Sequence, residues 1–176
     1  MSRQNPELSK SKILVNSENL LNDVNLLAIQ LKNKFQDELL HSLVLRGGKT
    51  LFNLISNTLG TNLVKMPIDL SKLDSSSEFD LDGLSNEKVK NKNILLIDGI
   101  VISGTTHLNL MKKILKYNPK SISLVSLAKK NGHVNFEKMN FCAIYTFNKE
   151  FVAGCGIGEP PFSNSQSLYD LSKLIY

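Results

Sequence analysis

The sequence has few of the features that mark membrane, secreted or metal-binding proteins. It contains two cysteines, Cys142 and Cys155, and neither belongs to a run with the spacing of metal ligands. No stretch approaches 18 uninterrupted apolar residues, and the first residues lack the apolar segment that follows the basic start of a secretory signal. We therefore expect a cytoplasmic protein with reduced, structural thiols and no membrane partner.

The lysines lack the aromatic neighbours that are typical of nucleic-acid-binding surfaces. Lysine and arginine total 21 against 16 acidic residues, which gives a net charge of +5, and the basic residues are scattered. This balance suits a nucleic-acid surface or a small anionic ligand, and a solvated lysine-rich surface explains most of it. We expect no nucleic-acid partner.

The chain has the size and composition of one soluble globular domain. It has 176 residues, of which 41% are hydrophobic and 21% charged. We assign residues 1–176 to a single domain with a core of about 15–147. The polar segment of about 71–91 is expected to be mobile and near the site, and a disordered insertion is the alternative. The remaining residues, about 148–176, would form a hood.

Apolar periodicity predicts alternating strands and helices without a repeat. A helix is expected from Ser17, as its cap, to Phe35, and another from Lys49 to Leu59. A stripe of Leu108, Met111, Ile114 and Leu115 predicts a further helix, and the tail from Ser165 to Tyr176 has helical spacing. Strands are expected at 39–45, 62–68, 94–97, 122–128, 141–147 and 151–153. The pattern predicts an α/β fold with an open, mostly parallel central sheet flanked by helices.

The most informative stretch is NILLIDGIVISGTT, which begins at Asn93. An aliphatic run ends in Asp98, and the loop of Ser103, Gly104, Thr105 and Thr106 then opens a helix. Ligands of parallel sheets bind where strands end, and the amides of a helix start attract anions. A carboxylate upstream of such a loop suits a sugar phosphate, with the acid on ribose hydroxyls. The alternative is a tight turn that Ser103 or Thr105 caps.

The common phosphate-binding fingerprints, G-x-x-x-x-G-K and G-x-G-x-x-G, do not describe this loop. Its pattern of hydrophobic run, acid, aliphatics and Ser-Gly-x-Thr resembles the phosphoribosyl-pyrophosphate (PRPP) loop of the type I phosphoribosyltransferases. The resemblance is to the hypoxanthine-guanine branch, in which the central sheet has a small hood formed by terminal segments. It extends over about residues 40–158.

The resemblance implies roles for several residues. Ser103, Gly104, Thr105 and Thr106 would bind the 5′-phosphate of PRPP, and Asp98 would be the catalytic acid on the ribose. Arg46 and Gly47 resemble the pyrophosphate loop, in which the bond after Leu45 would be a cis peptide. Residues matching the base-binding segments are Lys130, Phe151 and Val152.

The resemblance also implies a reaction and its partners. A purine base of the hypoxanthine or guanine kind would displace pyrophosphate from PRPP, as in purine salvage. Mg²⁺ would be the cofactor, with Asp98 and Glu159 as candidate ligands, and the protein would be a homo-oligomer, either a dimer or a tetramer.

Three positions depart from the family's pattern. Gly99 stands where a second acid usually lies, Ile102 where the branch has an aspartate near the purine N7, and Gly158 where an acid follows the hood's glycines. An alternative function is therefore a catalytically weak or inactive homologue that binds PRPP or a nucleotide in a regulatory role. Of the histidines, we expect His107 to face solvent at a helix start and His41 to be structural. For His133 a neutral surface-loop histidine is favoured over a contact near the base pocket.

Overall fold

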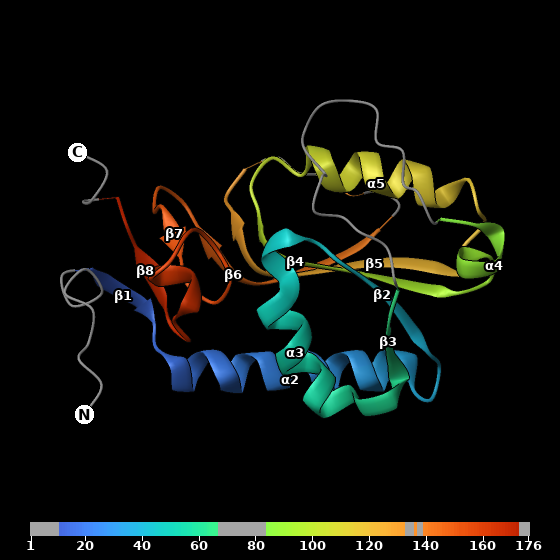
Figure 1. Ribbon diagram of the computed structural model, residues 1–176, viewed down its shortest axis with the longest axis horizontal. Coiled ribbons are helices and arrows are strands. Elements are labelled where there is room, and N and C mark those ends of the chain that lie inside the picture. Colours follow the sequence, from blue (N-terminus) through green and yellow to red (C-terminus); the bar gives the residue numbers. More distant parts are fainter. Residues whose placement is uncertain (1–10, 67–83, 133–135, 137–138, 173–176) are drawn as a thin grey trace.

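The computed structural model describes residues 11–66, 84–132, 136 and 139–172. Two sheets organise this part of the chain (Figure 1). A five-stranded sheet has the order β3-β2-β4-β5-β6, with every neighbouring pair parallel, and a three-stranded antiparallel sheet has the order β1-β8-β7. The predicted α/β fold, a parallel sheet with a small hood of terminal segments, is confirmed.

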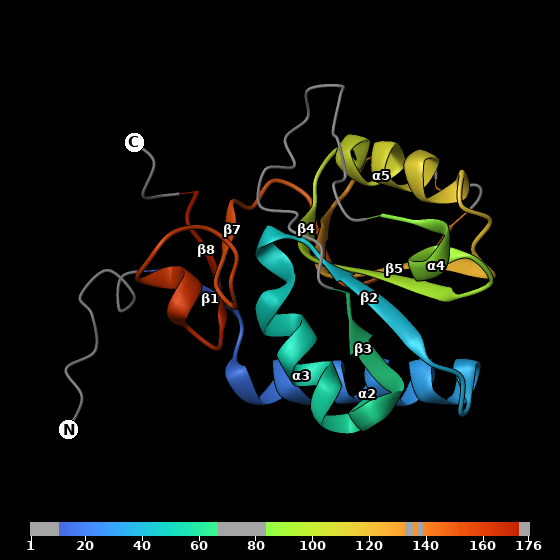
Figure 2. The same ribbon diagram turned by 45° about the vertical axis from the view of Figure 1, so that its right-hand side comes forward.

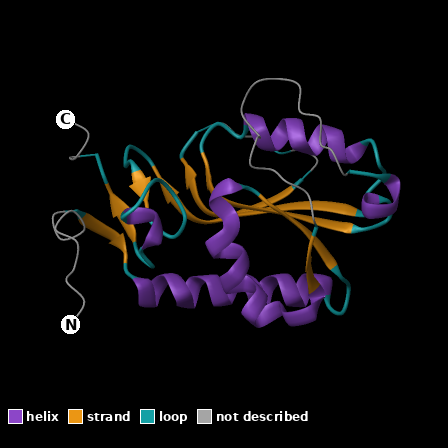
Figure 3. Ribbon diagram, viewed as in Figure 1, coloured by secondary structure: helices purple, strands orange, loops and turns teal. Residues whose placement is uncertain are grey.

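The elements of the large sheet alternate along the chain. Its strands are β2 (Leu40–Val44), β3 (Leu63–Lys65), β4 (Asn93–Val101), β5 (Ser121–Lys130) and β6 (Asn140–Phe147). Its helices are α2 (Ser17–Phe35), α3 (Lys49–Leu59), α4 (Asn86–Val89) and α5 (Thr105–Leu115), with short 3-10 turns η1 (Arg46–Gly48) and η2 (Gly60–Asn62). Figure 3 colours these elements by type.

Helices cover both faces of the large sheet. Figures 1 and 2 place α5 on one face and α2 with α3 on the other. The side chains of β4 divide between two apolar clusters: Leu95 and Ile97 pack with α2 and α3, whereas Ile94 and Leu96 pack with α5. Each of these four side chains is at most 1% exposed, so each contributes about 1.5 to 3 kcal/mol. Double coverage explains why β4 reads as a continuous apolar run.

The small sheet lies at one end of the large one (Figure 1). It contains β1 (Lys12–Val15), β7 (Val152–Ala153) and β8 (Leu168–Asp170), and η3 (Phe162–Asn164) precedes β8. The prediction of a helix over the tail is wrong for its described part, because Leu168 and Tyr169 are buried and pair with β1. The helical spacing of the tail's leucines was misleading, since tertiary pairing overrode it.

Two other expectations need correction. Asn16, not Ser17, caps α2: its side-chain oxygen accepts the N–H of Asn19 at 2.9 Å. The expected loop of about 71–91 falls partly outside the described residues, and its described end contains α4.

Burial distinguishes the two thiols. Cys155 is 1% exposed, and burial raises the pKa of its thiol to about 11. It therefore stays protonated at neutral pH and is structural, as expected. Cys142 is instead exposed on β6, and neither cysteine forms a disulfide. No helix within the described ranges combines the length and apolarity that crossing a bilayer requires.

Candidate functional site

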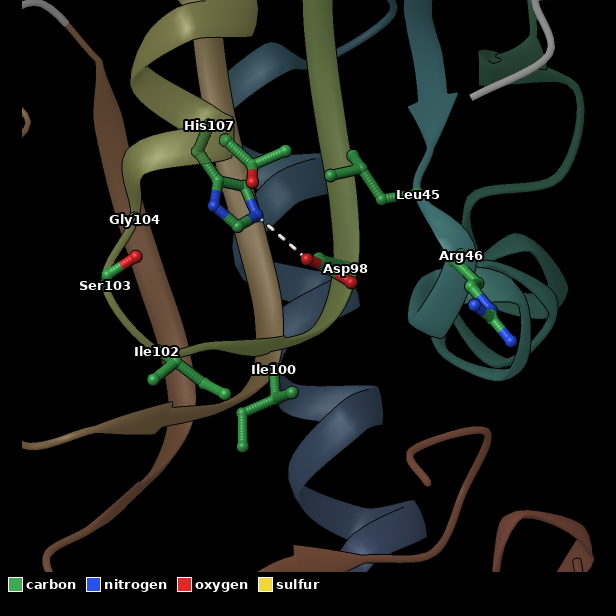
Figure 4. A pocket seen from close by; sticks show the side chains of 9 residues that line it. Leu45, Arg46, Asp98, Ile100, Ile102, Ser103, Gly104 and His107 are labelled. Atoms are coloured by element: carbon green, nitrogen blue, oxygen red, sulfur yellow. Dashed lines mark hydrogen bonds and ion pairs between the residues drawn. The ribbon is translucent and has the colours of Figure 1, made fainter. Parts of the chain in front are cut away.

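A cavity of about 290 Å³ opens near the carboxyl ends of β2 and β4. Its lining comes from three segments: the end of β2 with η1, the second half of β4, and the start of α5 (Figure 4). The lining residues are Leu45, Arg46, Asp98, Ile100, Ile102, Ser103, Gly104, Thr106 and His107. Five of the predicted site residues therefore line one cavity, although Arg46 is more than 50 positions from the others. The other four are Asp98, Ser103, Gly104 and Thr106.

The start of α5 provides free backbone donors at one side of this cavity. Gly104, at φ 73°, occupies the cap position and has no side chain to bond the first turn. The Leu108 N–H donates to the Gly104 carbonyl at 2.9 Å. The N–H groups of Thr105, Thr106 and His107 come before this bond and have no acceptor within the helix. Ser103 Oγ lies 3.4 Å from the Thr105 nitrogen, a long contact that caps only weakly. This arrangement suits an anion better than a self-capped turn.

Asp98 lies within β4 rather than at its end. The strand continues to Val101, and Ile100 and Val101 still pair with β5. Because side chains alternate along a strand, Asp98 shares the face of Ile94 and Leu96 and points toward α5. Its Oδ1 accepts the Gly99 N–H at 2.7 Å.

His107 meets the other oxygen of this carboxylate. Its Nε2 lies 2.8 Å from Asp98 Oδ2, and the side chains of His107 and Asp98 are only 6% and 14% exposed. Figure 4 shows the two side chains facing one another between the start of α5 and β4. Phe136 packs edge-on against the imidazole, with ring centroids 6.4 Å apart. The prediction that His107 faces solvent is wrong.

A signal for the burial of His107 is present in the sequence. The buried residues of α5 are His107, Leu110, Met111 and Ile114, which follow the i, i+3, i+4, i+7 spacing of one helix face. The predicted stripe was rotated slightly, because Leu108 and Leu115 only flank the cluster. Extending the stripe back by one turn places His107 in the core.

Gly99 has no room for a side chain. A Cβ built on it would lie 2.6 Å from the Gly47 carbonyl oxygen and 2.8 Å from Ile157 Cγ1, closer than real contacts allow. The missing second acid is therefore a consequence of packing: η1 approaches β4 so closely that only glycine fits there.

Gly158, the other glycine that replaces an acid, has a backbone requirement. Its φ is 79°, a left-handed conformation that L side chains rarely adopt. Glu159 follows it and lies 3.8 Å from Arg46, with both side chains 84% exposed. Such an exposed pair contributes little to stability, so Arg46 can turn toward an anionic ligand at small cost.

The peptide bond between Leu45 and Arg46 is trans. Among the described residues, the cis peptide bond is the one between Pro160 and Pro161. The expectation of a cis bond is wrong. Leu45 is extended, at φ −75° and ψ 168°, and its N–H donates to the Ile97 carbonyl at 2.9 Å. The chain thus leaves β2 while still bonded to β4 and turns directly into η1.

The predicted base-binding residues lie outside the cavity lining. Lys130 ends β5 and is exposed, Phe151 is 56% exposed, and Val152 is buried in β7 opposite Asp170. His133 lies outside the described residues. In the described chain, no three His, Cys, Asp or Glu side chains gather closely enough to hold a metal ion.

The cavity lining is chemically mixed. Ile100, Ile102 and Leu45 supply apolar surface, and Ile102 is 59% exposed. Arg46, Asp98, Ser103 and Thr106 supply charge and hydroxyl groups. Such a site suits a ligand that carries both a phosphate and a less polar ring.

Comparisons with known proteins found one matching family and several similar structures. The family model for the phosphoribosyl transferase domain matches residues 11–159. A hypoxanthine phosphoribosyltransferase from Staphylococcus aureus is similar in structure, with a TM-score of 0.81 and 18% identity over 99% of each chain. A hypoxanthine-guanine phosphoribosyltransferase from Bacillus anthracis has a TM-score of 0.73 and 21% identity, over 92% of this chain and 98% of that one.

A third similar structure is a variant hypoxanthine phosphoribosyltransferase from Trypanosoma cruzi, complexed with its product IMP. Its TM-score is 0.77 with 16% identity, over 99% of this chain and 96% of that one. No curated protein sequence matches the chain.

Proposed function

We propose that this chain, which belongs to the phosphoribosyl transferase domain family, transfers the 5-phosphoribosyl group of PRPP to a purine base of the hypoxanthine or guanine kind. Pyrophosphate is the other product, and the reaction would serve purine salvage. One observation supports this most directly. A single cavity joins the weakly capped start of α5, the Asp98 carboxylate and the Arg46 side chain.

Each group of PRPP has a partner in this proposal. The amides and hydroxyls at Ser103, Gly104, Thr105 and Thr106 bind the 5′-phosphate, which favours the positive end of α5. Asp98 accepts hydrogen bonds from the ribose hydroxyls. Pyrophosphate binds at η1, where Arg46 brings its charge and Gly47 its backbone.

The transfer itself needs little covalent chemistry from the protein. The C1–O bond to pyrophosphate breaks and its electron pair leaves with pyrophosphate, while a ring nitrogen of the base bonds to C1 and gives up its proton. Positive charge develops at C1, so the chain contributes by orienting both reactants and excluding water. Ile102 cannot accept the base proton, which therefore passes to another acceptor.

The base and the metal complete the proposal. The hood would cover the base, with Phe151 stacking on it, Val152 bonding its edge through the backbone and Lys130 meeting an exocyclic oxygen. Mg²⁺ normally binds through one or two carboxylates together with substrate phosphates, and Asp98 and Glu159 are the candidates here. When bound, it would neutralise charge on the departing pyrophosphate.

A pyrophosphate-release assay tests the proposed reaction. With PRPP and Mg²⁺, we expect release with hypoxanthine or guanine in preference to adenine or xanthine. Asp98→Asn should lower kcat/KM by about 100-fold, because it removes the charge that orients the ribose. Asp37→Asn, an exposed position after α2, is the matched control and should equal wild type. The absence of turnover with all four bases at micromolar enzyme would contradict the proposal.

A second candidate function rests on Gly99 and Gly158. Packing leaves no room for a side chain at Gly99, and the φ of 79° at Gly158 disfavours one, so glycine stands at the positions of two acids of the family's pattern. A PRPP or nucleotide binder with weak or no catalysis would keep the phosphate cradle and lose these groups. This candidate predicts that a nucleoside monophosphate raises the Tm of the protein without Mg²⁺. It also predicts that no pyrophosphate is released with any of the four bases.

A further inference from the structure

One polar contact at the cavity is not used by any of the roles proposed for PRPP. His107 lies in the first turn of α5, is 4% exposed, and contacts the Asp98 carboxylate at 2.8 Å. Its other ring nitrogen, Nδ1, is buried without a hydrogen-bond partner in the described part of the chain. A polar side chain in this setting needs a reason, because an apolar residue would fill the same space without an unpaired atom.

The buried Nδ1 indicates where the imidazole proton lies. A buried N–H without an acceptor is rarer and more costly than a buried lone pair without a donor. The proton of a neutral imidazole is therefore on Nε2, from which it is donated to Asp98 Oδ2. Together with the Gly99 N–H on Oδ1, this bond fixes the plane of the carboxylate.

The fixed carboxylate still has capacity for a ligand. A carboxylate has about four lone-pair sites, and the two bonds described use one on each oxygen. One site per oxygen is left, which suits two neighbouring hydroxyl groups of one sugar. A family member with two adjacent acids can divide this task, but Gly99 has no room for the second acid here.

We infer that His107 is a positioning residue that orients Asp98 so that a single carboxylate recognises both hydroxyl groups of the ribose. Its place in the first turn of α5 also links this carboxylate directly to the element that forms the phosphate cradle. The inference rests on the proposed function, since it assigns a role within the same site. A merely structural histidine would support the packing of α5 and leave sugar recognition unchanged.

The test compares ribose 5-phosphate with 2-deoxyribose 5-phosphate in NMR titrations of the protein. Neither probe contains a base, so the result does not depend on which base is used. Wild type should bind the ribose form at least ~10-fold more tightly, the value of one hydrogen bond to a charged acceptor. His107→Leu should reduce this preference to about 1 while its affinity for 2-deoxyribose 5-phosphate stays near wild type.

Two further variants keep the inference testable if His107→Leu folds poorly. His107→Gln retains an N–H donor near the place of Nε2 and should restore most of the preference. Asp98→Asn should lose the preference, and adding His107→Leu to it should change the ratio no further.

The opposite results would overturn the inference. One is that His107→Leu or Asp98→Asn still prefers ribose 5-phosphate. The other is that a folded His107→Leu variant loses affinity equally for both probes. If wild type releases pyrophosphate but shows no preference between the probes, the inference alone fails. If wild type neither binds the probes nor releases pyrophosphate, the proposed function fails with it.

Discussion

Gly99→Asp is expected to lower the stability of the protein without adding transferase activity, although it restores the acid of the family's pattern. A Cβ at this position would lie 2.6 Å from the Gly47 carbonyl oxygen. Overpacking a tight contact costs about 1 to 3 kcal/mol, which we expect for Gly99→Ala. Gly99→Asp should cost more, because its charge is also forced against a carbonyl oxygen.

Chemical denaturation of these variants measures the effect. Gly132 is the matched control position, since a Cβ there would meet nothing within 4 Å. Gly132→Ala and Gly132→Asp should unfold at the wild-type denaturant concentration. If Gly99→Asp is as stable as Gly132→Asp, η1 does not pack on β4 as described. A Gly99→Asp variant with raised turnover would instead show that the second acid has room to act.

Thr106→Asp is expected to weaken nucleotide binding by at least ~100-fold. Thr106 lines the cavity in the first turn of α5, so an aspartate there would face the phosphate group at close range. Juxtaposed like charges cost several kcal/mol, and a 100-fold loss corresponds to about 2.8 kcal/mol. Calorimetric titration with guanosine monophosphate measures the change.

Asn109→Asp is the control for this charge. It adds the same carboxylate to the same helix one turn further along, at a position outside the cavity lining. Its affinity should stay within about threefold of wild type, apart from a general decrease that salt screens. Equal losses in the two variants would mean that net charge, and not the cradle, controls binding.

Local apolar patterns predicted most of the fold. The helices over Ser17–Phe35 and Lys49–Leu59 have the predicted limits, because their buried positions repeat at helical spacing and a glycine follows the second. The parallel sheet followed from strands buried on both faces. The terminal segments were harder, since β1 was not predicted and Leu168–Asp170 formed a strand where a helix was expected. Short strands depend on partners that are distant in sequence, and local pattern carries little information about them.

The candidate site was predicted in composition but not in its internal contacts. Arg46, Asp98 and the Ser103 loop do share one cavity. The Asp98 to His107 contact was missed, although strand alternation and the α5 stripe together place both side chains between β4 and α5. The close approach of Gly47 to Gly99 has no sequence signal, because it depends on how η1 packs against β4.

Some predictions still await their first test. The contacts of Lys130, Phe151 and Val152 with a base stay predictions, because these residues lie outside the cavity lining. The homo-oligomer and the role of Mg²⁺ likewise stay predictions. Each concerns a molecule that binds the chain, and local sequence pattern says little about such a molecule.

Calorimetric titration of wild type with PRPP, with and without Mg²⁺, tests the central proposal that this cavity binds a phosphoribosyl group. We expect saturable binding at one site per chain, competition by guanosine monophosphate, and loss of the heat in Thr106→Asp. Mg²⁺ should tighten the binding of PRPP more than that of the monophosphate, because only PRPP carries a pyrophosphate whose charge a bound Mg²⁺ would neutralise. The absence of saturable heat from PRPP, guanosine monophosphate and adenosine monophosphate alike, in protein that melts cooperatively, would contradict it.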